Sequence, residues 1–186
     1  MTKKHLGTKS LLEREDSVLI VIDVQDKLMP VIANKGQIIH NIVRLLKFSK
    51  IIGLPVILTE QEKLGSTVSE IKKEIPDVPL IAKSAFSCFF CNEFIEQIRQ
   101  IGRKKLILTG VETHICIAQT ALHALPHFVV HVVSDAVSSR THENFTIGIE
   151  RMRQEGAIIT STEMMIFELL KKAGTDEFRA ALQLVK

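Results

Sequence analysis

The chain contains no tryptophan and no tyrosine, and only three of its 186 residues are cysteines. The missing aromatics remove the commonest platforms for stacking exposed nucleic-acid bases. Lysine and arginine are spread along the chain and the formal net charge is only +3, so there is no basic stripe for a phosphate backbone. Three cysteines are also too few for the disulfide framework of a secreted domain. We therefore expect no nucleic-acid partner and a reducing environment.

Long apolar runs are missing as well. No stretch reaches the roughly 20 apolar residues of a membrane helix, so we expect no membrane contact. The first sixteen residues, MTKKHLGTKSLLERED, are charged and have neither the apolar core nor the cleavage site of a secretory signal. We predict a cytoplasmic protein with a loose segment over 1–16. Because repeats, low-complexity stretches and linkers are absent, residues 1–186 are expected to form a single domain.

Apolar runs of strand length alternate with amphipathic stretches of helical length. The first strand, SVLIVIDVQ over 17–25, is almost continuously apolar, as in a strand that is buried on both faces of a sheet. Further strands are predicted over 54–61, 78–84, 104–110, 127–137 and 157–162, and helices over 36–53, 67–75, 91–102, 113–125, 143–156, 163–174 and 175–186. The pattern predicts the α/β class, a three-layer α/β/α sandwich around a mainly parallel sheet of about six strands.

Polar residues follow the carboxyl ends of these strands, which is where open parallel sheets bind their ligands. They are Asp23, Gln25, Glu60, Gln61, Lys83, the segment 110–116 and Asp135. Either Asp23 or Lys83 alone could be a solvated loop charge. Two opposite charges at the same sheet edge as a thiol indicate a chemical site instead.

The thiol is that of Cys116, in the first turn of the helix predicted over 113–125, with Thr113 as its expected N-cap. Unpaired N–H groups and the positive end of the helix dipole favour a thiolate there. With Lys83 nearby, we expect the pKa of this thiol to be depressed. The alternative for Cys116 is a small buried hydrophobic residue, which is the commoner fate of a single cysteine.

Three motifs, IDVQ at 22–25, AKSAFS at 82–87 and GVETHIC at 110–116, resemble those of the isochorismatase-like cysteine hydrolase superfamily. That superfamily includes nicotinamidases, N-carbamoylsarcosine amidohydrolases and isochorismatases. The resemblance extends over the whole chain, and the subgroup of isochorismatase-domain-containing proteins is the most similar. It implies a Rossmann-like, isochorismatase-like hydrolase fold.

The resemblance also implies roles for individual residues. It places a catalytic triad on Asp23, Lys83 and Cys116, and a cis peptide bond between Val111 and Glu112. The backbone N–H groups of Glu112 and Cys116 would form an oxyanion hole. Such a site hydrolyses a small amide, ureide or related C–N substrate in two steps, through a thioester.

Two neighbours of the triad and one missing motif bear on the substrate. Gln25 and Phe86 are candidates for lining the pocket, with packing or capping as the alternative. Nicotinamidases carry an Asp-x-His metal site after the second strand, whereas TEQEKLGST at 59–67 has no histidine. We therefore expect no metal, no other cofactor and a substrate other than nicotinamide. True isochorismatases lack the nucleophilic cysteine, so Cys116 argues against their vinyl-ether cleavage.

Two other functions are left open by the sequence. Cys88 and Cys91 in SCFFC have the C-x-x-C spacing of a thiol-redox protein, although they do not directly follow a strand and have no second ligand pair for zinc. A non-catalytic small-molecule-binding or scaffold protein could also use this fold. The apolar segment FSCFF at 86–90 indicates an interface, so we expect a homo-oligomer acting on a small molecule.

Overall fold

Six parallel strands form one sheet in the computed structural model, which describes residues 10–185. The strands are β1 Ser17–Ile22, β2 Val56–Gln61, β3 Leu80–Lys83, β4 Lys105–Val111, β5 Val129–Ser138 and β6 Ile158–Thr160. They lie in the order β3-β2-β1-β4-β5-β6, and each neighbouring pair is parallel. The predicted α/β class and the six-stranded parallel sheet are confirmed.

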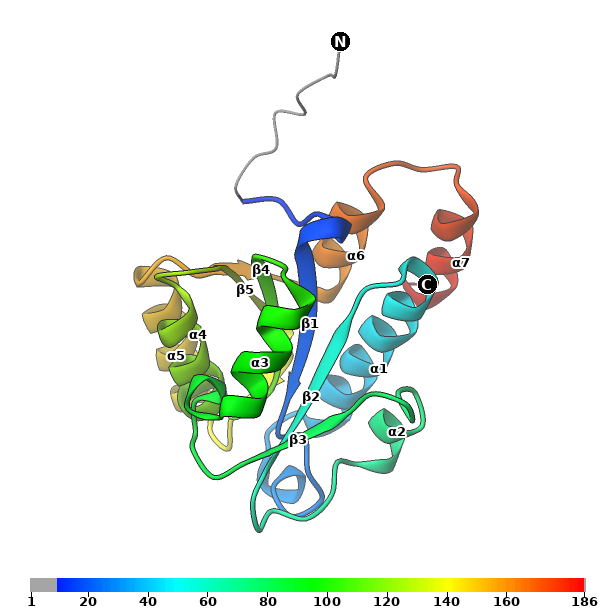
Figure 1. Ribbon diagram of the computed structural model, residues 1–186. Helices are drawn as coiled ribbons and strands as arrows, with labels where there is room; N and C mark the ends of the chain where they lie inside the picture. Colours follow the sequence, from blue (N-terminus) through cyan, green and yellow to red (C-terminus); the bar gives the residue numbers. More distant parts are fainter. Residues whose placement is uncertain (1–9, 186) are drawn as a thin grey trace.

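Helices cover both faces of the sheet, as Figure 1 shows. On one side lie α1 Lys35–Ile52, α2 Ser69–Lys72, α6 Thr162–Leu170 and α7 Asp176–Val185, and on the other α3 Asn92–Ile101, α4 Ala118–Ala124 and α5 His142–Gln154. Short turns η1 Arg14–Asp16, η2 Met29–Val31, η3 Cys88–Phe90 and η4 Thr113–Ile117 connect the larger elements. None of the helices over residues 10–185 is long and apolar enough to cross a membrane.

Continuous apolar strands are what make this three-layer arrangement stable. All six residues of β1 are buried. Since successive side chains of a strand point to opposite faces, Leu19 and Val21 pack toward α1, whereas Val18 and Ile20 pack toward α3 and α4. Both faces therefore bury apolar surface, which explains why the run does not alternate with polar residues.

The N-terminal segment is a correction to the sequence prediction of a loose stretch over 1–16. Residues 1–9 lie outside the described residues, and Leu11 is exposed, but from Leu12 on the segment is fixed to the rest of the protein. Leu12 is buried and its N–H donates a hydrogen bond to Glu168 Oε2 at 3.0 Å. The Lys105 ammonium donates to the Leu11 carbonyl at 2.7 Å. The segment thus provides hydrogen-bond partners for Glu168 and Lys105 at the amino end of the sheet.

The first strand also ends earlier than predicted, at Ile22 rather than at 25. Asp23 turns the chain by adopting φ of 55°, a left-handed conformation that few residues other than glycine adopt. On the neighbouring strand, Gly110 has φ of 111°, and a Cβ there would lie 2.0 Å from the Ile22 carbonyl oxygen. Only glycine allows β4 to approach β1 this closely.

The chain leaves the two central strands, β1 and β4, in opposite directions, toward β2 and toward β5. Where the strand order reverses in this way, the loops diverge and leave an opening at the carboxyl ends of the strands. The fold thus places one predictable site beside the ends of β1 and β4.

Candidate active site

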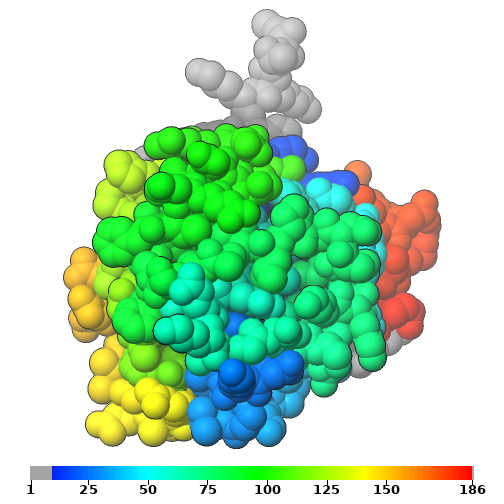
Figure 2. Space-filling model, turned by 60° about the horizontal axis from the view of Figure 1, so that its bottom comes forward, coloured from blue at the N-terminus to red at the C-terminus, as the bar shows by residue number. Residues whose placement is uncertain are grey.

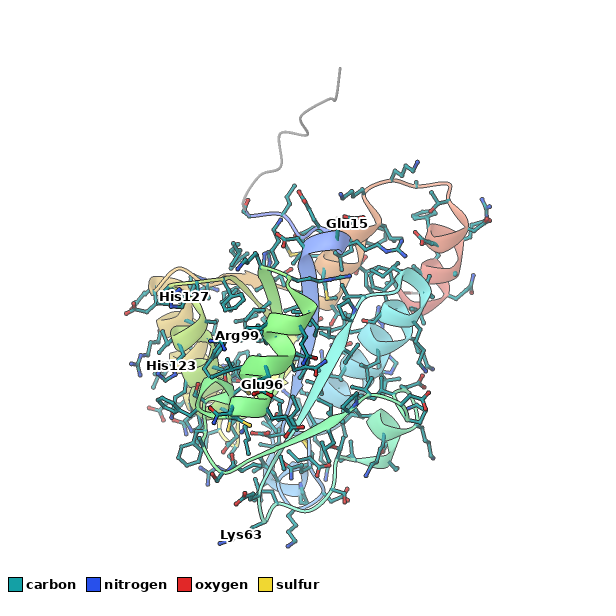
Figure 3. The ribbon with its side chains drawn as sticks, viewed as in Figure 1. Glu15, Lys63, Glu96, Arg99, His123 and His127 are labelled. Carbon is teal, nitrogen blue, oxygen red and sulfur yellow. The ribbon has the colours of Figure 1, made fainter. Side chains whose placement is uncertain are left out.

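The carboxyl ends of the strands face downward in Figure 1 and come forward in Figure 2, where loops coloured blue, teal, green and yellow meet. In Figure 3, Glu15 marks the opposite end of the sheet and Lys63 marks the end where the site lies. His123 and His127 lie to one side, around α4. The three residues singled out by the resemblance all belong to segments at the carboxyl end.

The structure brings Asp23, Lys83 and Cys116 together. The Lys83 ammonium lies 2.6 Å from Asp23 Oδ2 and 3.9 Å from Cys116 Sγ. The side chains of the ion pair are 1% and 0% exposed, so water does not screen the two charges. The site therefore places a fixed carboxylate and a fixed ammonium ion next to a thiol.

Hydrogen bonds from β2 and β3 hold the two charges. Thr59 Oγ1 donates to Asp23 Oδ1 at 2.8 Å. Lys83 donates to Asp23, to Gln61 Oε1 at 2.9 Å and to the Ala85 carbonyl at 3.2 Å. An ammonium ion has three N–H donors, so these three oxygens and the more distant Cys116 sulfur share them.

Cys116 lies in η4, a single π-helical turn that continues into α4. The prediction that Thr113 caps this helix is wrong. The N-cap position belongs to Glu112, no side chain caps the turn, and the buried Thr113 hydroxyl has no hydrogen-bond partner among the described residues. The wider turn begins one residue earlier than an α-helix capped by Thr113 would.

The predicted depression of the Cys116 pKa is also wrong in direction. Burial and the Asp23 carboxylate raise the pKa of this thiol, and Lys83 opposes them only in part. Burial works against the charge of Lys83, but Asp23 and Cys116 outweigh it and raise the pKa of the ammonium. The resting site is therefore an ion pair beside a neutral thiol. The sequence could not reveal this, because burial depends on how the surrounding loops pack.

Glu112 precedes the nucleophile turn, and the peptide bond between Val111 and Glu112 is cis. Its carboxylate Oε2 accepts hydrogen bonds from the N–H of Arg140 at 2.9 Å and from Arg140 Nε at 3.1 Å. Its carbonyl accepts from the N–H groups of Ile115 and Ile117. Oε2 and the carbonyl oxygen of Glu112 are thus both engaged within the protein.

The two predicted pocket residues lie in very different surroundings. Gln25 is fully buried, and its amide exchanges hydrogen bonds with the backbone of Gln61 and Gly65. Its contact with substrate remains a prediction that this burial does not favour. Phe86 is 53% exposed and follows β3, and its role as a pocket residue also remains a prediction.

Other residues at the strand ends have structural partners. Glu60 Oε1 accepts hydrogen bonds from the N–H and the hydroxyl of Thr67. Asp135 Oδ1 accepts from the N–H and the hydroxyl of Thr162, at the start of α6. These two carboxylates stabilise loops and a helix terminus rather than joining the ion pair.

The C-x-x-C cysteines do not form a matched redox pair. Cys88 is buried in η3, where burial raises its pKa to about 12, and its N–H donates to Thr120 Oγ1 at 3.1 Å. Cys91 is partly exposed and lies at the start of α3. All three cysteines are free. Within residues 10–185, no group of three or more His, Cys, Asp or Glu side chains is arranged to hold a metal ion.

Sequence comparisons agree with this arrangement. A family model described as the isochorismatase domain matches residues 17–164. The secreted isochorismatase effector Isc1 of Phytophthora sojae (strain P6497) is 41% identical over 190 residues, covering 98% of this chain and 89% of that protein.

Three solved structures have the same fold with a TM-score of 0.88. The MAR1 ribonuclease of Caenorhabditis elegans is 32% identical, with 94% of this chain and 92% of that chain covered. YcaC from Pseudomonas aeruginosa, solved with hexane-2,5-diol and covalent acrylamide, is 26% identical, with 96% and 93% covered. The YcaC gene product of Escherichia coli, described as an octameric hydrolase of unknown specificity, is 28% identical, with 98% and 91% covered. Since the family model spans all six strands of the sheet and most of its helices, and a relative over 30% identical covers nearly the whole chain, this chain belongs to the isochorismatase family and has its hydrolase fold.

Proposed function

We propose that the protein is a cysteine-dependent hydrolase that cleaves a small amide, ureide or related C–N substrate through a thioester intermediate. The observation that carries the proposal is the buried Asp23–Lys83 ion pair beside the Cys116 thiol. A nucleophile with an adjacent base, and a cation near the developing charge, is the arrangement that acyl transfer needs.

In the first step, Cys116 Sγ attacks the substrate carbonyl carbon while its proton passes to Asp23. Because burial keeps the resting thiol neutral, this transfer accompanies the attack rather than preceding it. The backbone N–H groups of Glu112 and Cys116 are the proposed donors to the oxyanion. Asp23 then returns the proton to the leaving nitrogen, the C–N bond breaks and a thioester remains on Cys116.

In the second step, water attacks the thioester carbonyl while Asp23 accepts a proton from it. The C–S bond breaks, the acid product leaves and the proton returns to the Cys116 sulfur. Lys83 remains an ammonium ion throughout, because its three N–H groups are held by three oxygens. Its role is to stabilise negative charge on Asp23 and on the sulfur in turn.

The relatives support a nucleophile and an assembly of several subunits. The Pseudomonas aeruginosa YcaC was solved with covalent acrylamide, which supports the proposal of a reactive Cys116 here. The Escherichia coli YcaC is described as an octamer, and here Phe86 and Phe90 are 53% and 69% exposed. We propose that the present chain also forms a homo-oligomer, which size-exclusion chromatography with light scattering would test.

The central experiment is a hydrolysis screen of small amides, ureides and esters, with mass spectrometry of the intact protein to trap the acyl-enzyme. We expect turnover and a covalent adduct on Cys116 in the wild type. Cys116→Ala should have neither, and Cys91→Ala should retain both. Turnover that survives in Cys116→Ala would refute the mechanism.

The same screen addresses the metal and the alternative substrate. Since the described residues offer no metal-binding cluster, prolonged EDTA treatment should leave turnover unchanged. The Caenorhabditis elegans relative is named a ribonuclease, so a single-stranded RNA belongs in the screen. We expect no RNA cleavage that depends on Cys116.

The predicted cytoplasmic location needs its own test by fractionation, since the Phytophthora sojae relative is named a secreted effector.

A further inference from the structure

Gln61, the last residue of β2, lies beside the ion pair and takes no part in the chemistry described above. Its side-chain oxygen accepts a hydrogen bond from Lys83 at 2.9 Å. We infer that Gln61 is a positioning residue that holds the Lys83 ammonium toward Asp23 and keeps its hydrogen bond to Cys116 long. The inference rests on the proposed function only for its effect on turnover, because the orientation of Lys83 can be measured without a substrate.

The Gln61 amide can point in only one direction. Its Nε2 donates to the Ser84 carbonyl at 2.7 Å, and its Oε1 accepts from Lys83. A flipped amide would bring N–H groups toward the ammonium and an oxygen toward a carbonyl, so both contacts would become repulsive. Lys83 and Ser84 are consecutive residues at the end of β3. The oxygen of the Gln61 amide therefore bonds to one of them and its nitrogen to the other.

A second glutamine fixes the backbone of the first. Gln25 Oε1 accepts from the Gln61 N–H at 2.8 Å, and Gln25 Nε2 donates to the Gln61 carbonyl at 2.9 Å and to the Gly65 carbonyl at 2.7 Å. The Gln25 side chain thus pairs with Gln61 as a neighbouring strand would. Because Gln25 lies two residues after Asp23, these bonds join the ends of β1, β2 and β3 at the triad.

Positioning matters because four acceptors compete for the three N–H groups of Lys83. Asp23, Gln61 and the Ala85 carbonyl lie within 3.2 Å, and Cys116 Sγ accepts a longer hydrogen bond at 3.9 Å. If the Gln61 oxygen is removed, one competing acceptor is lost, and the hydrogen bond from Lys83 to the Cys116 sulfur is free to shorten. A sulfur that receives this bond is stabilised as a thiolate.

The test is the rate of iodoacetamide alkylation against pH, measured separately for each cysteine by mass spectrometry. Gln61→Met removes the acceptor and keeps the length of the side chain, so Cys116 should react about tenfold faster at pH 7, the effect of lowering its pKa by one unit. Gln61→Glu keeps the acceptor and adds a negative charge, so Cys116 should react about tenfold slower. Gln100→Met, on the exposed side of α3, is the matched control and should match the wild type.

Opposite shifts in the two variants distinguish positioning from structural damage. Partial unfolding would speed alkylation in both, and would also expose Cys88, which is fully buried in the folded protein. Profiles that coincide with the wild type, or that shift in the same direction, would overturn the inference. Gln61→Leu also lacks the acceptor and should shift the profile as Gln61→Met does, so it takes the place of Gln61→Met if that variant does not fold.

Turnover gives an independent readout with any substrate found in the screen. Both variants should lower kcat about tenfold with little change in KM, because Asp23 and Lys83 lose their alignment while substrate contacts remain. If the wild type hydrolyses nothing and the alkylation profiles still shift in opposite directions, the inference stands and the proposed function fails. If the wild type shows turnover and the alkylation profiles do not move, the proposed function stands and the inference about Gln61 fails.

Discussion

Lys83 Nζ lies 2.6 Å from Asp23 Oδ2, and both side chains are buried. Removing one partner of such a pair leaves an unpaired charge in the interior, which costs about 3–5 kcal/mol. The pair therefore belongs to the proposed active site and also links the end of β1 to the end of β3. Variants at its two ends are expected to differ in their effects on the nearby thiol.

The thiol of Cys116 should respond to the two charges in opposite directions. Asp23→Asn removes a charge that raises the pKa of this thiol, so alkylation at pH 7 should be faster, while hydrolysis stops because the base is lost. Lys83→Met removes the charge that lowers the same pKa, so alkylation should be slower. Alkylation rates that do not change in either variant would show that these charges do not control Cys116.

The other two cysteines should matter little for turnover. Cys91→Ala changes a partly exposed side chain and should leave hydrolysis unchanged. Cys88→Ala leaves a small cavity next to Thr120 and should lower the free energy of unfolding by about 1 kcal/mol while most activity remains. The reverse pattern, with activity lost in these variants and kept in Cys116→Ala, would favour the thiol-redox function.

His131 should make the folded protein sensitive to acid. It is fully buried on β5, neither ring nitrogen has a partner among the described residues, and burial together with Lys105 lowers its pKa from 6.5 to about 4. Below pH 6.5 His131 binds a proton in the unfolded chain, but in the folded protein it remains neutral down to about pH 4. Stability should fall as the pH drops from 6.5 to about 4 and then level off, by on the order of 3 kcal/mol in total.

Urea denaturation at pH 7.5 and pH 4.5 checks this expectation. His131→Leu removes the titrating group, so its free energy of unfolding should exceed that of the wild type. The difference between the two should be larger at pH 4.5 than at pH 7.5. His127→Leu, at an exposed position, is the control and should follow the wild type at both pH values. An advantage of His131→Leu that does not depend on pH would contradict the role assigned to His131.

Gly148 on α5 packs against the nucleophile turn. A Cβ at this position would lie 3.0 Å from the Cα of His114 and 3.1 Å from its backbone nitrogen. Backbone atoms cannot rotate away, so Gly148→Ala should displace η4 and lower kcat about tenfold. Gly36→Ala on α1 meets nothing within 4 Å and should instead stabilise the protein by about 0.5–1 kcal/mol with unchanged kcat. Equal kinetics of the two variants would show that η4 tolerates the shift.

Much of the fold follows from local patterns in the sequence. The apolar run at 17–22 and the amphipathic run at 36–52 appear as a buried strand and a helix, because side-chain periodicity is a local property. The meeting of Asp23, Lys83 and Cys116 could also be predicted, since parallel strands bring their carboxyl ends to one edge. The sequence offered no signal for Thr59 and showed Gln61 only as one of several polar residues at the strand ends.

Tertiary structure alone decided the electrostatic state of the site. The sequence places Cys116 near a helix start and a lysine, which predicts a thiolate, yet burial and Asp23 keep the thiol neutral. It also shows Gln61 as one more polar residue after a strand, whereas the fold directs its oxygen to Lys83. Sequence determines which groups reach the sheet edge, because that depends on strand order and length. Solvent exclusion and hydrogen-bond partners depend on how distant segments pack around that edge, and no local pattern encodes them.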